Sequence, residues 1–299
     1  MPGRPPARNG CGVMGGSGNK ITSIDDPSPI LDDMPTRSFH SLFDMIFPDY
    51  FSFLAQFQLF GIAHLLALIV TFLTAFALTR YARKSPDAKI LKQVRYTMAV
   101  LLVTAVSLDP VLTLVRYGTG SFGWEMVVKS ALPLYLCDVV SFLLAYALVT
   151  GSQRITEIGF LWGIAGTTQG LITPILLFDG SNIEFYVFFL QHGGVPIAAI
   201  FLVWGLKIVP EKGALLRIFC WSWGYMAIVM TINWIIGQNY GFLNELPNPG
   251  TLFDHMGPYP YYLITLQGIA FTLYCILLKI APKPPTEKLP EISGKTRAS

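Results

Sequence analysis

The chain has 299 residues, of which 53% are hydrophobic and only 13% charged, and its formal net charge is +3. Soluble domains carry about 25% charged residues, so this composition excludes an ordinary soluble globular domain. The positive charge requires no nucleic-acid partner, because the basic residues follow a membrane-topology pattern. Several hydrophobic stretches reach about 20 residues, enough to cross a ~30 Å hydrocarbon core as a helix. We therefore expect an all-α, polytopic membrane protein.

Three parts follow one another along the chain. Residues 1–39 are rich in Gly, Pro, Ser and Asp and lack hydrophobic periodicity, which predicts a disordered N-terminal tail. Residues 40–282 form the predicted membrane domain, and residues 283–299 a cytoplasmic C-terminal tail. The hydrophobic stretches predict a bundle of seven spans, at 57–79, 97–116, 127–150, 156–178, 183–206, 215–237 and 260–280.

The distribution of Lys and Arg gives the orientation of these spans. Fifteen of the 21 basic residues fall on one side, six of them in the loop 80–96, whereas the loops 179–182 and 238–259 contain none. Because basic loops face the cytoplasm, the N-terminus is expected outside and the C-terminus inside. The sequence contains no Asn-x-Ser/Thr glycosylation site, which fits the plasma membrane of a bacterium.

Polar side chains gather at the predicted midplane and in the outer half of the bundle, whereas the cytoplasmic half has almost no ionisable ones. At ~1.5 Å per residue, Cys137 and Asp138 lie about ten residues into a span, and His192 and Gln169 reach a similar depth. Such groups face the bundle interior or a wet cavity rather than lipid. They predict a pocket open to the outer side, beneath the loop 238–259. The other residues expected to bind a substrate there are His64, Asp109, Arg116, Tyr135 and Asn239.

Four prolines fall inside predicted spans and support a pocket. Each removes a backbone hydrogen bond and bends its helix. Their similar depth favours a cavity over a tightly packed bundle. They are Pro110, Pro133, Pro174 and Pro196.

Cys137 and His192 are the candidate catalytic pair. A thiol needs a base or a cation nearby to form the nucleophilic thiolate, and His192 is the only midplane candidate for that base. Asp138 could orient this histidine as the acid of a triad does, or form an ion pair with Arg116 or Lys129. The structural alternative is also open, because a cysteine in a membrane helix is often a small packing residue.

Three other polar residues have a second interpretation. Asp109 and Arg116 are seven residues apart, two helical turns, so they share a face and could pair with each other or bind a head group. His64 could orient a head group or close the pocket.

Five segments together resemble the YwaF-like bacterial membrane proteins, distant relatives of transmembrane protein 164. The resemblance implies one membrane domain over about residues 57–280. In the eukaryotic branch it implies acyl transfer between phospholipids through a cysteine and a histidine, and His192 matches that histidine. The bacterial pattern has histidine where this chain has Tyr135, and the eukaryotic cysteine position is held by Leu134. The matching segments are Leu132-Pro-Leu-Tyr-Leu-Cys137, Gln169-Gly-Leu-Ile-Thr-Pro174, Phe188-Phe-Leu-Gln-His192, Asn239-Tyr240 and Gly257-Pro-Tyr-Pro260.

Three functions compete at this point. The first is a lipid acyltransferase or ester hydrolase using Cys137 and His192. The second is a transporter or receptor-like protein that binds a lipid or small polar ligand in the bundle with the same residues. The third is a metal-dependent hydrolase using His64, His192, His255 and Asp109, but the sequence has no HxxxH or HExxH spacing. We expect membrane lipids as partners, no metal and no cofactor.

Overall fold

The computed structural model describes residues 57–84, 87–174, 176, 180, 182–247 and 252–283, and all regular structure within them is helical. The all-α prediction is therefore confirmed for these residues. All of them belong to the unit Tyr50–Ser299. The predicted tail 1–39 and the C-terminal tail from residue 284 onward lie outside the described residues.

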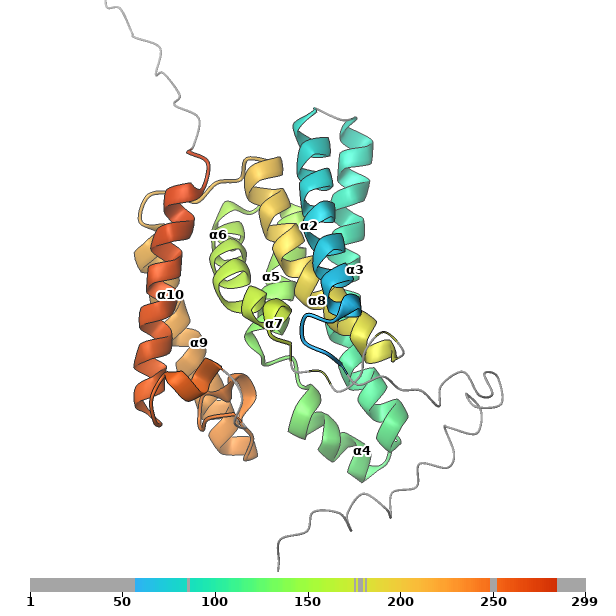
Figure 1. The fold of residues 1–299 in the computed structure, drawn as a ribbon, viewed down its shortest axis with the longest axis vertical. Helices are drawn as coiled ribbons and strands as arrows, with labels where there is room; N and C mark the ends of the chain where they lie inside the picture. Colours follow the sequence, from blue (N-terminus) through green and yellow to red (C-terminus); the bar gives the residue numbers. More distant parts are fainter. Residues whose placement is uncertain are drawn as a thin grey trace, which may run out of the picture. The chain divides into compact units, whose positions relative to one another are not determined.

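Five helical segments are long and apolar enough to cross a membrane (Figure 1). A sixth candidate is a bent pair, in which the short α4 and η2 (Ser121–Met126 and Val127–Ala131) are followed at 82° by α5 (Leu136–Thr150). The five are α2 (Ile62–Arg83), α3 (Ala88–Tyr117), α8 with its π-helical end η4 (Ile183–Ile200 and Phe201–Gly205), α9 (Ala214–Ile236) and α10 (Tyr261–Ile280).

The expected span 156–178 corresponds to three short helical pieces that follow one another. These are α6 (Gln153–Trp162), the π-helical η3 (Gly163–Thr167) and α7 (Thr168–Ile172). The part of the chain described here thus contains five or six candidate spans, and this expected seventh is not among them.

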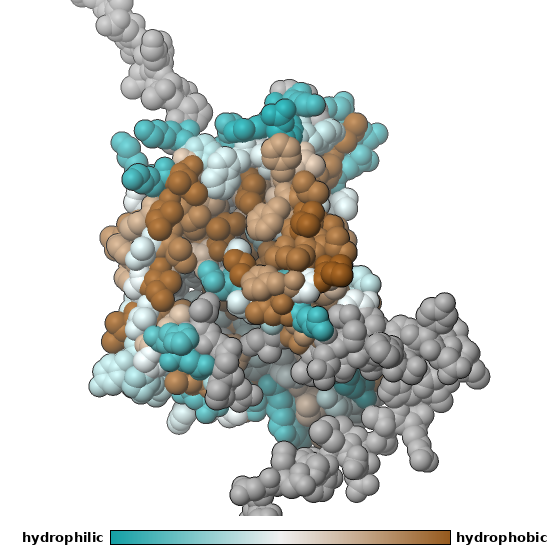
Figure 2. Space-filling model, in the orientation of Figure 1, coloured by the Kyte–Doolittle hydropathy of each residue, from teal (hydrophilic) through white to brown (hydrophobic). Residues whose placement is uncertain are grey.

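The outer helices expose large hydrophobic side chains. Ile62 is 81% exposed and Phe76 65% exposed on α2, and Ile264 is 64% exposed on α10. Figure 2 shows hydrophobic surface over α2 and α10 between more hydrophilic ends. Contiguous apolar surface of this extent is unfavourable in water and natural against lipid. The chain is an integral membrane protein.

The core lies among α5, α6 and α8, where Leu144, Phe160 and Val195 are fully buried. Glycines on α6 and η3 allow this packing. A Cβ atom on Gly159 would lie 2.5 Å from Leu144 Cδ2, and one on Gly166 would lie 2.5 Å from Leu136 Cδ2. Small residues let membrane helices approach closely. These contacts hold the first turn of α5 against η3.

A buried ion-pair cluster ties α6 to α9. Glu157 is 1% exposed, and its Oε2 lies 2.7 Å from Arg217 Nη2 and 3.7 Å from Arg154 Nη1. Its Oε1 accepts a 2.7 Å hydrogen bond from the backbone N–H of Glu211. Glu157 is the second residue of the expected span 156–178, so this span carries a buried ionisable group that the sequence analysis did not identify. The Arg154–Glu157 spacing of three residues places both on one helix face and could have indicated the cluster.

Candidate functional site

The predicted span 127–150 is interrupted at Leu132–Tyr135, which we call the helix break. The chain leaves helical geometry at Leu132, Pro133 lies inside the break, and α5 begins at Leu136. Cys137 is therefore the second residue of a new helix and does not lie ten residues into an old one. The depth argument from the sequence assumed one continuous helix, and proline alone did not show where it would end.

The four prolines have different roles. Pro110 and Pro196 lie inside α3 and α8, which continue past them. Pro174 follows the C-cap residue of α7 and so lies beyond that helix. Among the four, only Pro133 lies at the break between the two bent helices.

Two tyrosine hydroxyls complete the hydrogen bonding of the helix break. Tyr240 Oη accepts from the backbone N–H of Leu132 at 3.0 Å and donates to the carbonyl of Val128 at 2.9 Å. Tyr225 Oη, on α9, donates to the carbonyl of Leu134 at 2.8 Å. Unpaired backbone groups are costly inside a membrane. The hydrogen bonds from these two phenols therefore lower the free-energy cost of the helix break.

The loop after α9 carries Tyr240 to the break. Asn233 holds this tyrosine by two 2.9 Å hydrogen bonds, from its Nδ2 to the Tyr240 carbonyl and to its Oδ1 from the Tyr240 N–H. The Tyr240 ring lies 5.1 Å from the Tyr135 ring, centroid to centroid. Burial raises the pKa of the Tyr240 phenol, which keeps its proton available for donation. This part of the loop 238–259 therefore covers the break.

Cys137, Asp138 and Gln191 form a buried polar network at the start of α5. The Cys137 thiol lies 3.7 Å from Asp138 Oδ1, which also accepts a 2.6 Å hydrogen bond from Gln191 Nε2. The other carboxylate oxygen accepts from the backbone N–H of Tyr135 at 3.1 Å. Asp138 is 9% exposed. Its network joins α5 to α8.

Neither expected ion-pair partner of Asp138 contacts it. Lys129 pairs with Glu125 at 2.6 Å, one turn earlier on the same helical segment. Arg116 pairs with Glu184 in the first turn of α8, so the expected Asp109–Arg116 pair is not formed either. In the part of the chain that the structure describes, no ion pair involves Asp138, and Asp109 is exposed on α3.

His192 lies on α8 directly after Gln191. Its Nδ1 is 3.1 Å from the carbonyl of Phe188, and its ring stacks on the Phe188 ring at 3.9 Å. Because a carbonyl oxygen only accepts, Nδ1 must carry the proton and Nε2 the lone pair. A Cβ atom on Gly170 of α7 would lie 3.2 Å from Nε2, so the imidazole edge faces this glycine.

Cys137 and His192 are not hydrogen-bonded to each other among the described residues. The connection between them runs through Asp138 to Gln191, the residue before His192. Sequence reasoning missed Gln191 and Tyr225 as parts of this site. The Gln191-His192 dipeptide was a usable signal for the first, because adjacent polar residues in a span are rare. Nothing in the sequence pattern distinguished Tyr225 from other membrane tyrosines.

The remaining predicted residues have these positions. His64 is fully buried, with Nδ1 accepting from the Phe60 N–H and Nε2 donating to the Leu171 carbonyl, both at 3.0 Å. It thereby fastens the start of α2 to α7. Asn239 organises its own loop through Asn244 and Glu245, Tyr135 is the N-cap residue of α5, and Gln169 is exposed on α7.

Within the described segments, no group of three His, Cys, Asp or Glu side chains could hold a metal ion. The residues considered for a metal-dependent hydrolase do not converge there. His64 has both ring nitrogens bonded to backbone atoms. The polar network at the helix break is an arrangement for proton transfer or hydrogen bonding.

Comparison with known proteins places the chain in one family. A sequence profile described as the TMEM164 family matches residues 39–278, which include the helix break, α8 and nearly all of α10. No curated protein and no solved structure matches the chain.

Proposed function

The chain belongs to the TMEM164 family, and we propose that it is a membrane acyltransferase or ester hydrolase with Cys137 as its nucleophile. One observation carries this proposal. Cys137 lies in the first turn of a helix that begins inside the protein, and its thiol is bonded to a buried carboxylate. A helix N-terminus favours a thiolate through the positive end of the helix dipole, whereas the neighbouring carboxylate disfavours a second negative charge, so in this proposal the thiol proton passes to Asp138 as the sulfur attacks.

The same helix terminus can stabilise a reacting carbonyl. The first backbone N–H groups of a helix lack the usual i−4 partners; in α5 those of Asp138 and Val139 donate to the Tyr135 carbonyl, which leaves those of Leu136 and Cys137 for a ligand. Directed at a carbonyl oxygen, such groups form an oxyanion hole. The thiol of Cys137 and the N–H groups of this first turn are close together by chain geometry alone. An ester bound at this terminus therefore meets a nucleophile and an oxyanion site together.

The proposed reaction has two steps. In the first, Asp138 takes the thiol proton, the sulfur attacks the ester carbonyl of a membrane lipid, and the C–O bond breaks as the proton passes to the leaving alkoxide. In the second, His192 takes a proton through Nε2 from an incoming hydroxyl, which attacks the thioester. The C–S bond breaks and the proton returns to the sulfur. A lipid hydroxyl gives acyl transfer, and water gives hydrolysis.

These roles refine the sequence-based hypothesis that His192 is the base for Cys137. Asp138 is the direct hydrogen-bond partner of the thiol, at 3.7 Å. His192 Nε2, which carries the lone pair, lies on the ring edge that faces Gly170 and away from the Phe188 carbonyl, and it is the base for the incoming hydroxyl in this proposal. A division of the two proton transfers between two groups fits these contacts better than a Cys137–His192 dyad.

The topology is part of the same proposal. We expect the YwaF-like arrangement of seven spans, N-terminus outside and C-terminus cytoplasmic, in a bacterial plasma membrane, with α6, η3 and α7 as the fourth span. In Figure 1 the α2–α3 connection, the η4–α9 connection and the C-terminal end of α10 all lie at the same end. The Lys and Arg residues concentrate in these segments, as the positive-inside rule requires of cytoplasmic loops.

The test is acyl transfer to Cys137. The purified full-length protein in lipid nanodiscs is incubated with a phospholipid that carries an alkyne-tagged acyl chain, and hydroxylamine-sensitive label is measured on the protein. We expect labelling of the wild type and of Cys220→Ala, because Cys220 is an exposed cysteine on α9. Cys137→Ala should lose the label. His192→Ala should keep the label but release it at least tenfold more slowly.

Label that persists in Cys137→Ala, or that is absent from the wild type, would contradict the proposal. Each variant is checked for folding by its thermal unfolding in detergent. If a variant loses the label but keeps its unfolding temperature, the loss results from the missing reactive group and not from unfolding.

A second candidate function is a non-enzymatic binding protein for a lipid or small polar ligand. It is favoured by the discontinuous helix itself, because transporters bind substrates at the ends of broken membrane helices. It is also favoured by the absence of a Cys137–His192 hydrogen bond among the described residues. This function predicts ligand-induced thermal stabilisation that Cys137→Ser leaves unchanged, with no acylated protein.

A further inference from the structure

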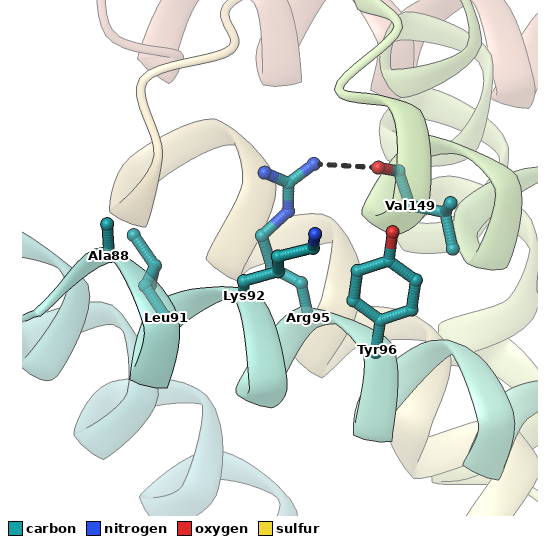
Figure 3. Close-up of a pocket in the computed structure, with 6 residues that line it drawn as sticks. All are labelled: Ala88, Leu91, Lys92, Arg95, Tyr96 and Val149. Carbon is teal, nitrogen blue, oxygen red and sulfur yellow. Dashed lines mark hydrogen bonds between the residues drawn. The ribbon is translucent and has the colours of Figure 1, made fainter.

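Two adjoining grooves lie on the surface between α3 and α5, away from the helix break. One, of about 310 Å³, is lined by Lys92 and Arg95 among other residues (Figure 3). The other, of about 410 Å³, is lined almost entirely by apolar residues. Both include Tyr96 and Val149, so they form one continuous groove with a basic end and an apolar length.

The basic end has two cations without a carboxylate partner among the described residues. Arg95 donates from Nε to the Leu148 carbonyl at 2.7 Å and from Nη2 to the Val149 carbonyl at 3.3 Å, as Figure 3 shows for Val149. It thereby caps the last turn of α5 with a positive charge. Lys92 has its Nζ 5.6 Å from the centre of the Tyr96 ring. The nearby carboxylate of Asp87 accepts from backbone N–H groups in the first turn of α3.

The apolar length of the groove matches one leaflet of a membrane. From Lys92 to Thr104 the α3 axis rises about 18 Å at ~1.5 Å per residue, against about 15 Å for half of a hydrocarbon core. Its floor includes Ala99 and Ala145, both 5% exposed, whose small side chains leave room for a ligand. The exposed side chains of Val100, Phe142 and Tyr146 form its walls.

We propose that this groove binds an anionic glycerophospholipid, with the phosphate at Lys92 and Arg95 and an acyl chain along the apolar length. Basic sites between helices on the cytoplasmic side of membrane proteins bind anionic head groups. The arrangement of charge and apolar surface selects this ligand: a zwitterionic lipid brings a cation of its own to the two cations of the groove, and a free phosphate leaves the apolar length empty. The cytoplasmic leaflet follows from the proposed topology, whereas the lipid class follows from the groove alone.

The site is independent of the proposed acyl transfer, because none of Cys137, Asp138 and His192 lines the groove. Its ligand is therefore a bound lipid that remains intact. It bridges α3 and α5, and in this way it stabilises the far end of the helix that carries Cys137 in its first turn.

The experiment measures lipid adducts on the purified full-length protein by native mass spectrometry. The probes are phosphatidylglycerol and phosphatidylcholine with identical long acyl chains, dihexanoyl phosphatidylglycerol, and glycerol phosphate. The wild type should retain long-chain phosphatidylglycerol at least fivefold more than phosphatidylcholine. It should retain the dihexanoyl lipid weakly and glycerol phosphate not at all.

Two variants of equal charge change locate the site. Lys92→Glu should reduce phosphatidylglycerol binding about fivefold or more, whereas Lys89→Glu, one turn away and outside the groove lining, should leave it within twofold. Thr104→Phe, an exposed position on the apolar length, should weaken the long-chain lipid and not the dihexanoyl one.

Three results would overturn the proposal: equal effects of the two lysine variants, equal retention of the two head groups by the wild type, or retention of glycerol phosphate as strong as that of the lipid. The first would show a diffuse basic surface. The last would show a phosphate site without lipid. The assay does not depend on catalysis, so it distinguishes failure of this site from failure of the acyl-transfer proposal.

Discussion

Glu157 and Asp138 are both buried carboxylates, and their surroundings differ. Glu157, 1% exposed, is paired with two arginines and accepts a backbone N–H. Asp138, 9% exposed, is bonded to the amide of Gln191, a backbone N–H and a thiol, with no ion pair in the described segments.

The difference indicates what each carboxylate does. A buried charge is costly unless an opposite charge compensates it. Glu157 has that compensation, and its role is to hold α6 against α9. Asp138 is held by hydrogen bonds alone, next to a thiol in the first turn of α5. Groups kept in such surroundings within a membrane usually mark function.

The largest expected effect is at Glu157. The Glu157→Gln substitution removes the carboxylate partner of Arg217, whereas Arg154 keeps its pair with Glu211, and it should lower the free energy of unfolding by about 2–4 kcal/mol. The usual cost of breaking a buried pair is about 3–5 kcal/mol, reduced here because Arg217 is 34% exposed. Chemical unfolding in detergent, followed by tryptophan fluorescence, measures it. The control Arg154→Gln, at a 56% exposed side chain, should cost less than about 1 kcal/mol, and equal losses would contradict the burial argument.

A smaller effect is expected at the helix break. The Tyr240→Phe substitution removes the acceptor for the Leu132 N–H and the donor to the Val128 carbonyl. Leaving these groups unpaired should cost about 1–3 kcal/mol. Hydrogen exchange should then be faster at Leu132 than in the wild type.

The matched control for this variant is Tyr259→Phe, at a 46% exposed tyrosine, which should behave as the wild type. Unchanged protection of the Leu132 amide in Tyr240→Phe would show that the phenol does not support the break.

The smallest effect on stability is expected at Asp138. The Asp138→Asn substitution conserves size and can still accept from Gln191, but its NH2 group replaces the oxygen that accepts from the Tyr135 N–H, so the free energy of unfolding should fall by about 1 kcal/mol. Acylation of Cys137 should nevertheless fall at least tenfold, because an amide cannot take the thiol proton. The lipid-labelling assay and the unfolding assay, run on the same samples, separate the two effects.

Glu125→Gln is the control for the loss of one carboxylate, since Glu125 is exposed and pairs only with Lys129 among the described residues. If Asp138→Asn loses as much stability as Glu157→Gln and labels normally, the two carboxylates have the same structural role.

The sequence predicted the helical membrane class because composition and hydrophobic length determine it directly. It also predicted that Cys137 and Asp138 share a site, because residues next to each other in the chain stay close together in the fold. It predicted one continuous helix through Pro133, and this was wrong. A proline bends a membrane helix in many proteins, and the full break here depends on hydroxyls from Tyr225 and Tyr240, about 90 and 108 residues away.

The hydrogen bonds of the histidines and the choice of ion-pair partners also depend on the folded structure. His192 and His64 bond to the backbone carbonyls of Phe188 and Leu171, and backbone carbonyls carry no sequence signature. Arg116 pairs with Glu184 on another helix, although Asp109 on its own helix face had the favourable spacing. Spacing along one helix identifies possible neighbours and does not rank them against neighbours from elsewhere in the fold.

Both phenols at the helix break come from one part of the chain, α9 and the residues that follow it: Tyr225 lies within α9, and Tyr240 four residues beyond its end. A tilt of α9 would withdraw both hydroxyls from Val128, Leu132 and Leu134 at once. The first turn of α5 would then lose its anchorage and reorient together with the sulfur of Cys137. The attachment of α9 and the position of the Cys137 thiol are thus coupled through the hydroxyl groups of two tyrosines.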